Sequence, residues 1–267
     1  MDIIKHFIAR KQINYDRIIF YVWPLAAATI SLILETSYFT SLFLFFGCPI
    51  IYLFYRNQKR IKKILLFSLP VFLVMAVVLD YICDITGIWA VASSVFNYRI
   101  LGQVPIENLI WLISYTIFVV AYYEYFFEFS DRDKNYRPRL KYFHAFFISV
   151  FIIFLAVYIT NKDWLYIKYF YLKFGIILGL LPTILMLARS PKLFTKFIKT
   201  GIYFFYHSLT YEITALYLGW WSFPGREIIG SVVLGRLSFP IEELLFWMTL
   251  GAVGLLSFYE FFDDDEK

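Results

Sequence analysis

Eight apolar runs follow one another along this 267-residue chain and limit the folds that it can adopt. They lie at about 18–34, 37–55, 64–82, 105–127, 142–160, 164–187, 199–218 and 240–262. A helix that crosses a bilayer needs ~20 mainly apolar residues, and the runs lack the alternation typical of strands in a membrane barrel. Because 61% of the residues are hydrophobic and only 17% are charged, the composition excludes an ordinary soluble domain. The sequence predicts an all-α membrane protein with about eight transmembrane helices.

Basic residues mark one side of these predicted helices. The segments 56–63 and 189–199 carry lysines and arginines and no acid, and 128–141 holds five basic residues among three acids. With eight spans, these segments and both termini lie on one side, which the positive-inside rule makes cytoplasmic. We therefore expect a multi-pass protein of the cell (inner) membrane, whose net charge of +5 reflects its orientation in the lipid bilayer and not nucleic-acid binding.

Short motifs recur in the same order at about half the chain length. Three pairs of segments match: Pro105-Ile106-Glu107 with Pro240-Ile241-Glu242 (242 − 107 = 135), Tyr122–Phe127 with Phe258–Phe262 (260 − 124 = 136), and Asp84-Ile85-Thr86 with Glu212-Ile213-Thr214 (212 − 84 = 128). This order predicts an internal duplication. Four spans in each copy give both the same orientation, so we expect tandem four-helix repeats related by a pseudo-two-fold axis along the membrane normal.

The predicted repeats divide the chain into five segments. They are a basic N-terminal lead-in at 1–17, a first repeat at 18–130, a cytoplasmic linker at 131–141, a second repeat at 142–262 and an acidic tail at 263–267. The lead-in does not resemble a cleavable signal peptide. In each repeat a loop precedes the last helix, at about 87–104 and 219–239. This loop is either a lid in the membrane interface or a surface loop with interfacial aromatic residues.

The candidate catalytic residues are carboxylates at the ends of apolar runs: Glu242, Glu243, Glu107, Glu212, Asp84 and Asp80. An acid within a membrane is costly and usually functional. Acids that meet in a low-dielectric site cannot all ionise, so the group titrates as a unit. The alternative is helix-start chemistry, in which a proline and an acid two residues later open each last helix. Because Glu242 and Glu243 point about 100° apart on a helix, we expect one to face a cavity while the other caps the helix or meets an arginine.

Aromatic residues flank these acids and are candidates for binding the substrate and stabilising a cation: Trp89, Trp111, Trp220, Trp221, Phe246 and Trp247. Ring faces stabilise a cation without attacking it. Acids with aromatic walls therefore suit chemistry that passes through a carbocation. The alternative is that these rings pack against the core and the lipid.

No cofactor or metal site is predicted. The chain has neither a Walker loop nor a Gly-x-Gly-x-x-Gly motif, and His6, His144 and His207 are too scattered for a metal site. Asp80-x-x-x-Asp84 is similar to one aspartate motif of intramembrane prenyltransferases, but the partner motif that would hold diphosphate through magnesium is missing. A reduced cofactor bound without a motif stays open, as does a homo-oligomer.

The two copies resemble the integral-membrane lycopene cyclases, namely the heterodimeric bacterial type, its fused bacterial and archaeal relatives, and the cyclase domain of fungal bifunctional carotenoid enzymes. Each copy has an acid near the end of one helix, a loop with tryptophan, and then Pro-Ile-Glu at the start of the next helix. The resemblance is firmest over 80–127 and 207–262. Pro240–Phe246 matches the family motif, whereas in the first copy Asn108 replaces the second acid and Trp111 stands where Phe is usual.

What the resemblance implies is a redox-neutral isomerisation of an apolar polyene. An acid protonates C2 of a linear ψ end group, the C5=C6 double bond attacks the cation at C1, and loss of a proton gives a β or an ε ring. The resemblance also implies Glu242, supported by Glu243 or Glu212, as the main acid–base centre, with Glu107 and Asp84 as its counterpart. Glu242→Gln is then expected to abolish cyclisation while the protein still folds.

Two other classes of function stay open. One is a different intramembrane isoprenoid enzyme, either a prenyltransferase or a carotenoid hydratase. The other is a non-catalytic membrane protein, such as a small transporter or a carotenoid-binding protein. Transporters also have duplicated halves and acids near the midplane. The acids of this chain lie at helix ends near one face, which favours the enzyme.

Overall fold

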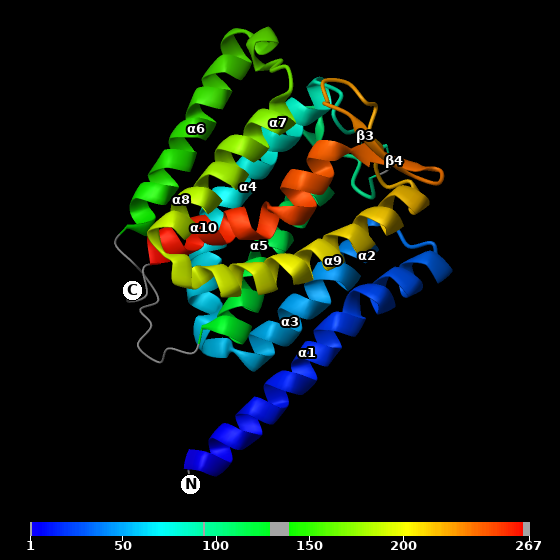
Figure 1. Cartoon of the computed structure of the whole chain (residues 1–267). Helices are drawn as coiled ribbons and strands as arrows, with labels where there is room; N and C mark the ends of the chain where they lie inside the picture. The colour runs from blue at the N-terminus through cyan, green and yellow to red at the C-terminus, as the bar shows by residue number, and fades with distance from the viewer. Residues whose placement is uncertain (1, 93, 129–138, 264–267) are drawn as a thin grey trace.

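The computed structural model describes residues 2–92, 94–128 and 139–263, and it is a bundle of helices with two small hairpins at one end (Figure 1). Most of the predicted linker at 131–141 and all but the first residue of the predicted tail at 263–267 lie outside the described residues. Residues 2–17 of the predicted lead-in belong to the first helix, α1 (Asp2–Ile33), because the sequence contains no glycine or proline before Pro24.

After α1, the first half of the bundle contains helices, short π and 3-10 segments, and one hairpin. These are α2 (Tyr38–Leu42), η1 (Phe43–Gly47), α3 (Cys48–Arg56), η2 (Gln58–Arg60), α4 (Ile61–Ile85), β1 (Arg99–Ile100), β2 (Val104–Pro105) and α5 (Ile106–Phe127). We refer to residues 38–128 as the first half. Both the α3 and the α5 segments start next to a proline, whose fixed φ suits the first turn of a helix.

The second half, residues 170–263, repeats this order of elements after α6 (Leu140–Thr160) and η3 (Lys162–Leu165). Its elements are α7 (Phe170–Phe174), η4 (Gly175–Leu180), α8 (Leu181–Arg189), η5 (Pro191–Leu193), α9 (Phe194–Leu218), β3 (Ser231–Leu234), β4 (Leu237–Pro240), η6 (Glu243–Thr249) and α10 (Gly251–Asp263). The π-helical segments η1 and η4 come directly before the α3 and α8 segments that carry Pro49 and Pro182, two prolines at matching places in the halves (182 − 49 = 133). A proline within a helix removes one hydrogen bond and displaces an earlier carbonyl, which explains the local widening.

The hairpins correct the all-α expectation. Strands β1 and β2 pair antiparallel, as do β3 and β4. A further antiparallel bridge joins Ala90 to Ser222, with both backbone hydrogen bonds at 2.9 Å. This bridge connects the two predicted loops, 87–104 and 219–239, across the halves. The described parts of the two loops are thus joined by backbone hydrogen bonds at the end of the bundle.

Six helical segments of the described chain are long and apolar enough to cross a membrane, or seven if one bent pair counts as a span. They are Gln12–Ile33, Tyr38–Arg56, Gln58–Ile85, Ile106–Phe127, Leu140–Thr160 and Phe170–Arg189, and the bent pair is Glu243–Thr249 with Gly251–Phe262, at 47°. The segment predicted at 199–218 lies in α9, a helix outside this set. Its lysines and Glu212 lower its hydropathy. By length and composition, the described chain thus accounts for six or seven of the eight predicted spans.

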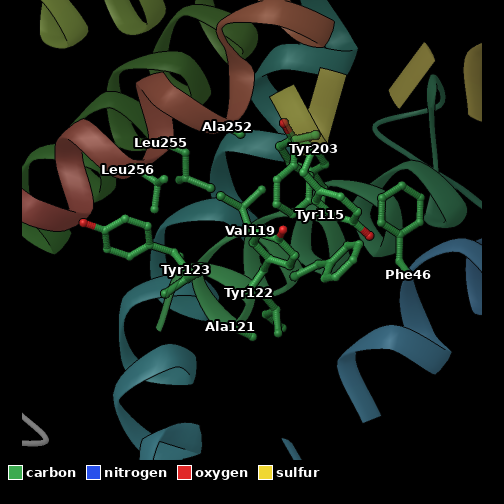
Figure 2. Packing of buried hydrophobic residues seen from close by; sticks show 14 of the residues in the cluster. Phe46, Tyr115, Val119, Ala121, Tyr122, Tyr123, Tyr203, Ala252, Leu255 and Leu256 are labelled. Carbon is green, nitrogen blue, oxygen red and sulfur yellow. The ribbon is translucent and has the colours of Figure 1, made fainter. Parts of the chain in front are cut away.

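The centre of the bundle is aromatic. Helix α5 is mostly buried, whereas α6 and α8 are mostly exposed and carry apolar side chains on the outside, as expected for helices that face lipid. In the core, Tyr122 of α5 stacks on Tyr203 of α9 with ring centroids 4.3 Å apart (Figure 2). Phe118 and Phe204 pack edge to face beside them at 5.0 Å. Such pairs contribute ~1 kcal/mol each beyond burial, which matters in a bilayer because apolar burial between helices gives little driving force there.

Candidate functional site

A cavity at the hairpin end of the bundle brings together acids from both halves. It contains about 400 Å³ of empty space and is lined by Tyr38, Asp80, Trp89, Val91, Asn108, Trp111, Tyr171, Glu212, Trp221, Phe223 and Glu243. We call it the acidic cavity. Asp80, Glu212 and Glu243 come from three different elements, and no lysine or arginine is among the described lining residues. All three carboxyl groups are buried, and buried carboxyl groups that lie close together do not all ionise.

Asp80 and Glu212 occupy matching places in the two halves. Each lies in the last part of its helix, α4 or α9, and their numbers differ by 212 − 80 = 132. Gly87 and Gly219 follow at the same offset, with φ of 69° and 71°, a left-handed conformation that favours glycine after a helix. The sequence motifs matched Glu212 with Asp84, whereas the structure matches Glu212 with Asp80, one helical turn earlier. Asp84 is only partly buried and does not line the cavity.

Polar side chains hold each acid of the cavity in place. The Tyr171 hydroxyl donates to Oε2 of Glu243 at 2.7 Å, and Nε1 of Trp221 donates to Oε1 of Glu212 at 2.8 Å. On the first-half side, Nδ2 of Asn108 donates to Oδ1 of Asp80 at 3.2 Å. The hydroxyl of Tyr38 donates to Oδ1 of the same asparagine at 2.9 Å. These contacts fix the orientation of all three carboxyl groups toward a common space.

Glu107 and Glu242, the glutamates of the two Pro-Ile-Glu motifs, lie away from the cavity lining. Both are fully buried. Glu107 accepts hydrogen bonds from the backbone N–H groups of Val95 and Phe96, at 2.5 and 3.3 Å, and from the Ser94 hydroxyl. Oε1 of Glu242 accepts from the backbone N–H of Ile229 at 2.7 Å. Each glutamate therefore ties the start of its last helix to the loop before the hairpin.

The six predicted aromatic residues separate into three groups. Trp89, Trp111 and Trp221 line the acidic cavity. Phe246 and Trp247 line a neighbouring cavity, and the ring of Trp247 lies 4.4 Å from that of Trp111. The sixth, Trp220, is buried outside both linings: its Nε1 donates to the carbonyl of Thr36 at 3.0 Å, and its ring stacks on Tyr38. Trp220 thus supports a wall of the site and does not face it.

The neighbouring cavity is larger and almost wholly apolar, with about 890 Å³ of space when its open mouth is included. We call it the apolar cavity. Its walls come from α4, α5, α6, α7, η4, η6 and α10, and they include Phe72, Met75, Leu79, Leu112, Phe143, Phe147, Phe174, Leu178, Phe258 and four glycines, with no charged residue in the described lining. Trp89, Trp111 and Tyr171 line both cavities. The two spaces therefore meet at an aromatic boundary, with acids on one side and hydrocarbon on the other.

Among the lining residues of the acidic cavity that sequence reasoning missed are two tyrosines that hold polar partners, Tyr38 and Tyr171. The first holds Asn108 from α2, and the second holds Glu243 from α7. A signal was present, because the two tyrosines have the same offset in the chain (171 − 38 = 133) as Pro49 and Pro182. A search for pairs at that offset would have found them.

No protein-family model matches the chain, and no curated protein or solved structure matches it either. The geometry can hold a linear apolar molecule with one end among acids and aromatic rings.

Proposed function

We propose that this protein is an intramembrane cyclase that closes a ring at the end of a linear isoprenoid, as do the membrane lycopene cyclases that its motifs resemble. The observation that carries the proposal is that an apolar cavity and an acidic one lie side by side and share Trp89, Trp111 and Tyr171 in their linings. A hydrocarbon chain fits the first space and presents its end group to the acids of the second. The substrate class is a polyene such as lycopene, which partitions into the membrane.

In the proposed reaction a carboxyl group protonates C2 of the ψ end group and leaves a tertiary cation at C1. The C5=C6 double bond attacks C1 and forms the ring, and a carboxylate then removes a proton from C6 or C4. The proton that enters and the proton that leaves balance, so the reaction is an isomerisation by general acid–base catalysis. Glu212 and Glu243 are the proposed proton-exchanging pair, because both are buried and face the cavity. Asp80 adds a third carboxyl group from the first half.

Aromatic rings surround the place where the cation would form. Trp89, Trp111, Tyr171 and Trp221 line the acidic cavity. Trp89 and Tyr171 meet edge to face with centroids 5.5 Å apart, so their faces are turned in different directions. Ring faces attract a cation by up to ~2 kcal/mol each when water is excluded. We therefore assign these residues to stabilisation of the cation, and we assign to Glu243 the proton-transfer role that the motif alone gave to Glu242.

The proposed arrangement in the membrane has eight spans, counted with α9 and with η6–α10 as one bent span. It gives two tandem four-helix repeats of the same orientation, each made of one half and the helix before it, α1 or α6. Both termini and the basic segments 56–63 and 189–199 then lie on the cytoplasmic side. The hairpins and the acidic cavity lie toward the opposite face of the inner membrane.

Pigment analysis of a bacterial host that makes lycopene tests this function. With the chain present, we expect lycopene to be replaced by a mono- or bicyclic carotene of the same mass, identified by chromatography and absorption. Unchanged lycopene in cells whose membranes contain the folded protein would contradict the proposal. A product that has gained water would instead indicate a hydratase.

A further inference from the structure

Two of the three π-helical segments of the described chain, η1 and η4, occupy matching places in the halves but differ in the size of their side chains. At the offset set by Pro49 and Pro182, Phe46 of η1 corresponds to Gly179 of η4 (179 − 46 = 133). Phe45 corresponds to Leu178 in the same way. The first half thus has a pair of phenylalanines where the second half has a leucine and a glycine.

In the second half this difference leaves a hollow. Gly179 lines the apolar cavity, and a Cβ atom added to it would meet no atom within 4 Å. Met75 and Leu79 of α4 form another part of the cavity wall. Gly179 of η4 and these two residues of α4 thus line the same open space.

In the first half the corresponding interface is filled. His207 and Tyr211 of α9 correspond to Met75 and Leu79 at the offset of Asp80 and Glu212 (211 − 79 = 132). The ring of Phe46 lies 5.1 Å from that of His207 and 5.0 Å from that of Tyr211, and Phe45 also contacts both rings. All four residues are buried: Phe45, Phe46, His207 and Tyr211 (Figure 2 labels Phe46). These four side chains form an aromatic plug.

We infer that the bound hydrocarbon chain enters one side of the pseudo-symmetric bundle alone, the side of η4 and α4, and that Gly179 sets this specificity while the aromatic plug closes the other side. The inference rests on the proposed function for the nature of the ligand, a linear apolar polyene. It makes the two halves unequal: both supply walls of the acidic cavity, but the chain-binding space lies on one side of the axis. The lining along η6 and α10 runs from Phe246 to Phe258, which corresponds to ~18 Å of helix.

Two variants test this inference by placing side chains of the aromatic plug at the matching positions of the apolar cavity. Gly179→Phe introduces the side chain found at the matching position 46, and Leu79→Tyr introduces the one found at 211. The matched control is Phe46→Leu, which changes the plug and not the cavity. Lycopene added to the purified protein is the probe, and quenching of tryptophan fluorescence is the measurement, because Trp89, Trp111 and Trp247 line the cavity.

We expect Gly179→Phe and Leu79→Tyr to weaken lycopene binding on the order of tenfold or more, since filling the space removes the volume that the chain needs. Phe46→Leu should bind as the wild type does. Size-exclusion profiles and thermal unfolding establish that each variant is folded, and Leu79→Tyr keeps the test available if Gly179→Phe does not fold. Binding unchanged in both filling variants, or lost in folded Phe46→Leu, would overturn the inference, as would a wild type that lycopene does not quench.

The outcome separates this inference from the proposed function. If the host experiment yields no cyclic carotene but lycopene still quenches the wild type and not Gly179→Phe, the one-sided binding site stands and the cyclase fails. If cyclic carotene forms at the wild-type rate in cells with folded Gly179→Phe, the cyclase stands and the assignment of the chain-binding side fails.

Discussion

Among the single residues of the site, two neighbouring glutamates have opposite environments. Glu242 accepts a hydrogen bond from a loop backbone, and Glu243 accepts one from Tyr171 at the acidic cavity. Their side chains diverge because successive residues of a helix point about 100° apart. The same division occurs in the first half, where Glu107 binds the loop and Asn108 faces the cavity.

Glu243→Gln should lower cyclisation by ~100-fold or more, because a positioned acid or base contributes about that factor and glutamine cannot exchange a proton. Glu242→Gln should retain most of the activity, since its amide oxygen can still accept from Ile229. Cyclic product per amount of membrane protein is the measurement. An inactive Glu242→Gln beside an active Glu243→Gln would restore the assignment made from the motif alone.

The sequence identified Asp80, Glu212 and Glu243 as candidates, and these three line one cavity. It could not rank them above Glu242. When a helix is apolar on all sides, its sequence does not show which face points to the protein interior. The pairing of Asp84 with Glu212 followed a local likeness of Asp-Ile-Thr to Glu-Ile-Thr. Gly87 and Gly219, with their shared left-handed backbone, were the stronger guide to register.

Among the helices and loops, Glu107 and Glu242 of the Pro-Ile-Glu motifs attach the last helix of each half to the loop before it. Glu107→Ala should destabilise the protein by about 2 kcal/mol or more, because it leaves the N–H groups of Val95 and Phe96 without their acceptor. The measurements are thermal unfolding in detergent and the rate of proteolysis in the loop 94–98. Glu107→Gln, which keeps an acceptor oxygen, serves as the control and should unfold close to the wild type. Equal stability of the alanine variant would show that the loop is held by other contacts.

The long helices could be predicted from apolar runs, and both last helices begin directly after Pro105 and Pro240 as expected. The bridge between Ala90 and Ser222 could not, since it depends on pairing between distant loops. The two hairpins, which pair neighbouring segments within each loop, were also missed. The π-helical segments also escaped prediction, although Pro49 and Pro182 lie just after two of them, η1 and η4.

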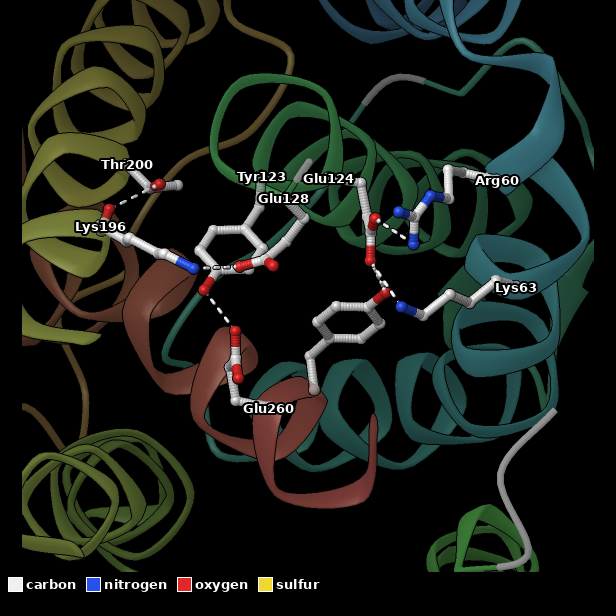
Figure 3. A network of polar contacts seen from close by, with 9 residues as sticks. Arg60, Lys63, Tyr123, Glu124, Glu128, Lys196, Thr200 and Glu260 are labelled. Carbon is white, nitrogen blue, oxygen red and sulfur yellow. Dashed lines mark hydrogen bonds and ion pairs between the residues drawn. The ribbon is translucent and has the colours of Figure 1, made fainter. Parts of the chain in front are cut away.

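Across the whole molecule, two tyrosine–glutamate hydrogen bonds between α5 and α10 join the two halves near the C-terminal ends of these helices (Figure 3). Tyr259 of α10 donates to Glu124 of α5, and Tyr123 of α5 donates to Glu260 of α10. Lys63 of α4 pairs with Glu124 at 2.8 Å, in a buried position. We call this set the cross-half clasp. Each half thus supplies a tyrosine that donates to a carboxylate of the other half.

Removing the central acid of the clasp should destabilise the fold strongly. Glu124→Leu removes the carboxylate that accepts from Lys63 and Tyr259, and breaking a buried ion pair in this way costs ~3–5 kcal/mol. The more exposed pair of Lys196 and Glu128 is the comparison, and Lys196→Met should cost less than ~1 kcal/mol. Denaturant or thermal unfolding in detergent measures both. Equal effects would mean that burial does not distinguish the two pairs.

The number of spans makes a separate prediction about the whole chain. If α9 crosses the membrane with the other segments, the N- and C-termini lie on the same side, and reporters fused to the two ends should both be active in the cytoplasm. Reporters on opposite sides would mean an odd number of spans, as when α9 does not cross.

Isotope incorporation by the purified protein shows whether the reaction is an acid-catalysed isomerisation. The measurement is the mass of the product formed from lycopene in ordinary water and in D₂O. We expect a cyclic product with the mass of the substrate in water, and one added deuterium for each ring in D₂O, because C2 takes its new hydrogen from an exchangeable carboxyl group. A cyclic product without deuterium, a product that has gained water, or no product from folded protein would contradict this mechanism.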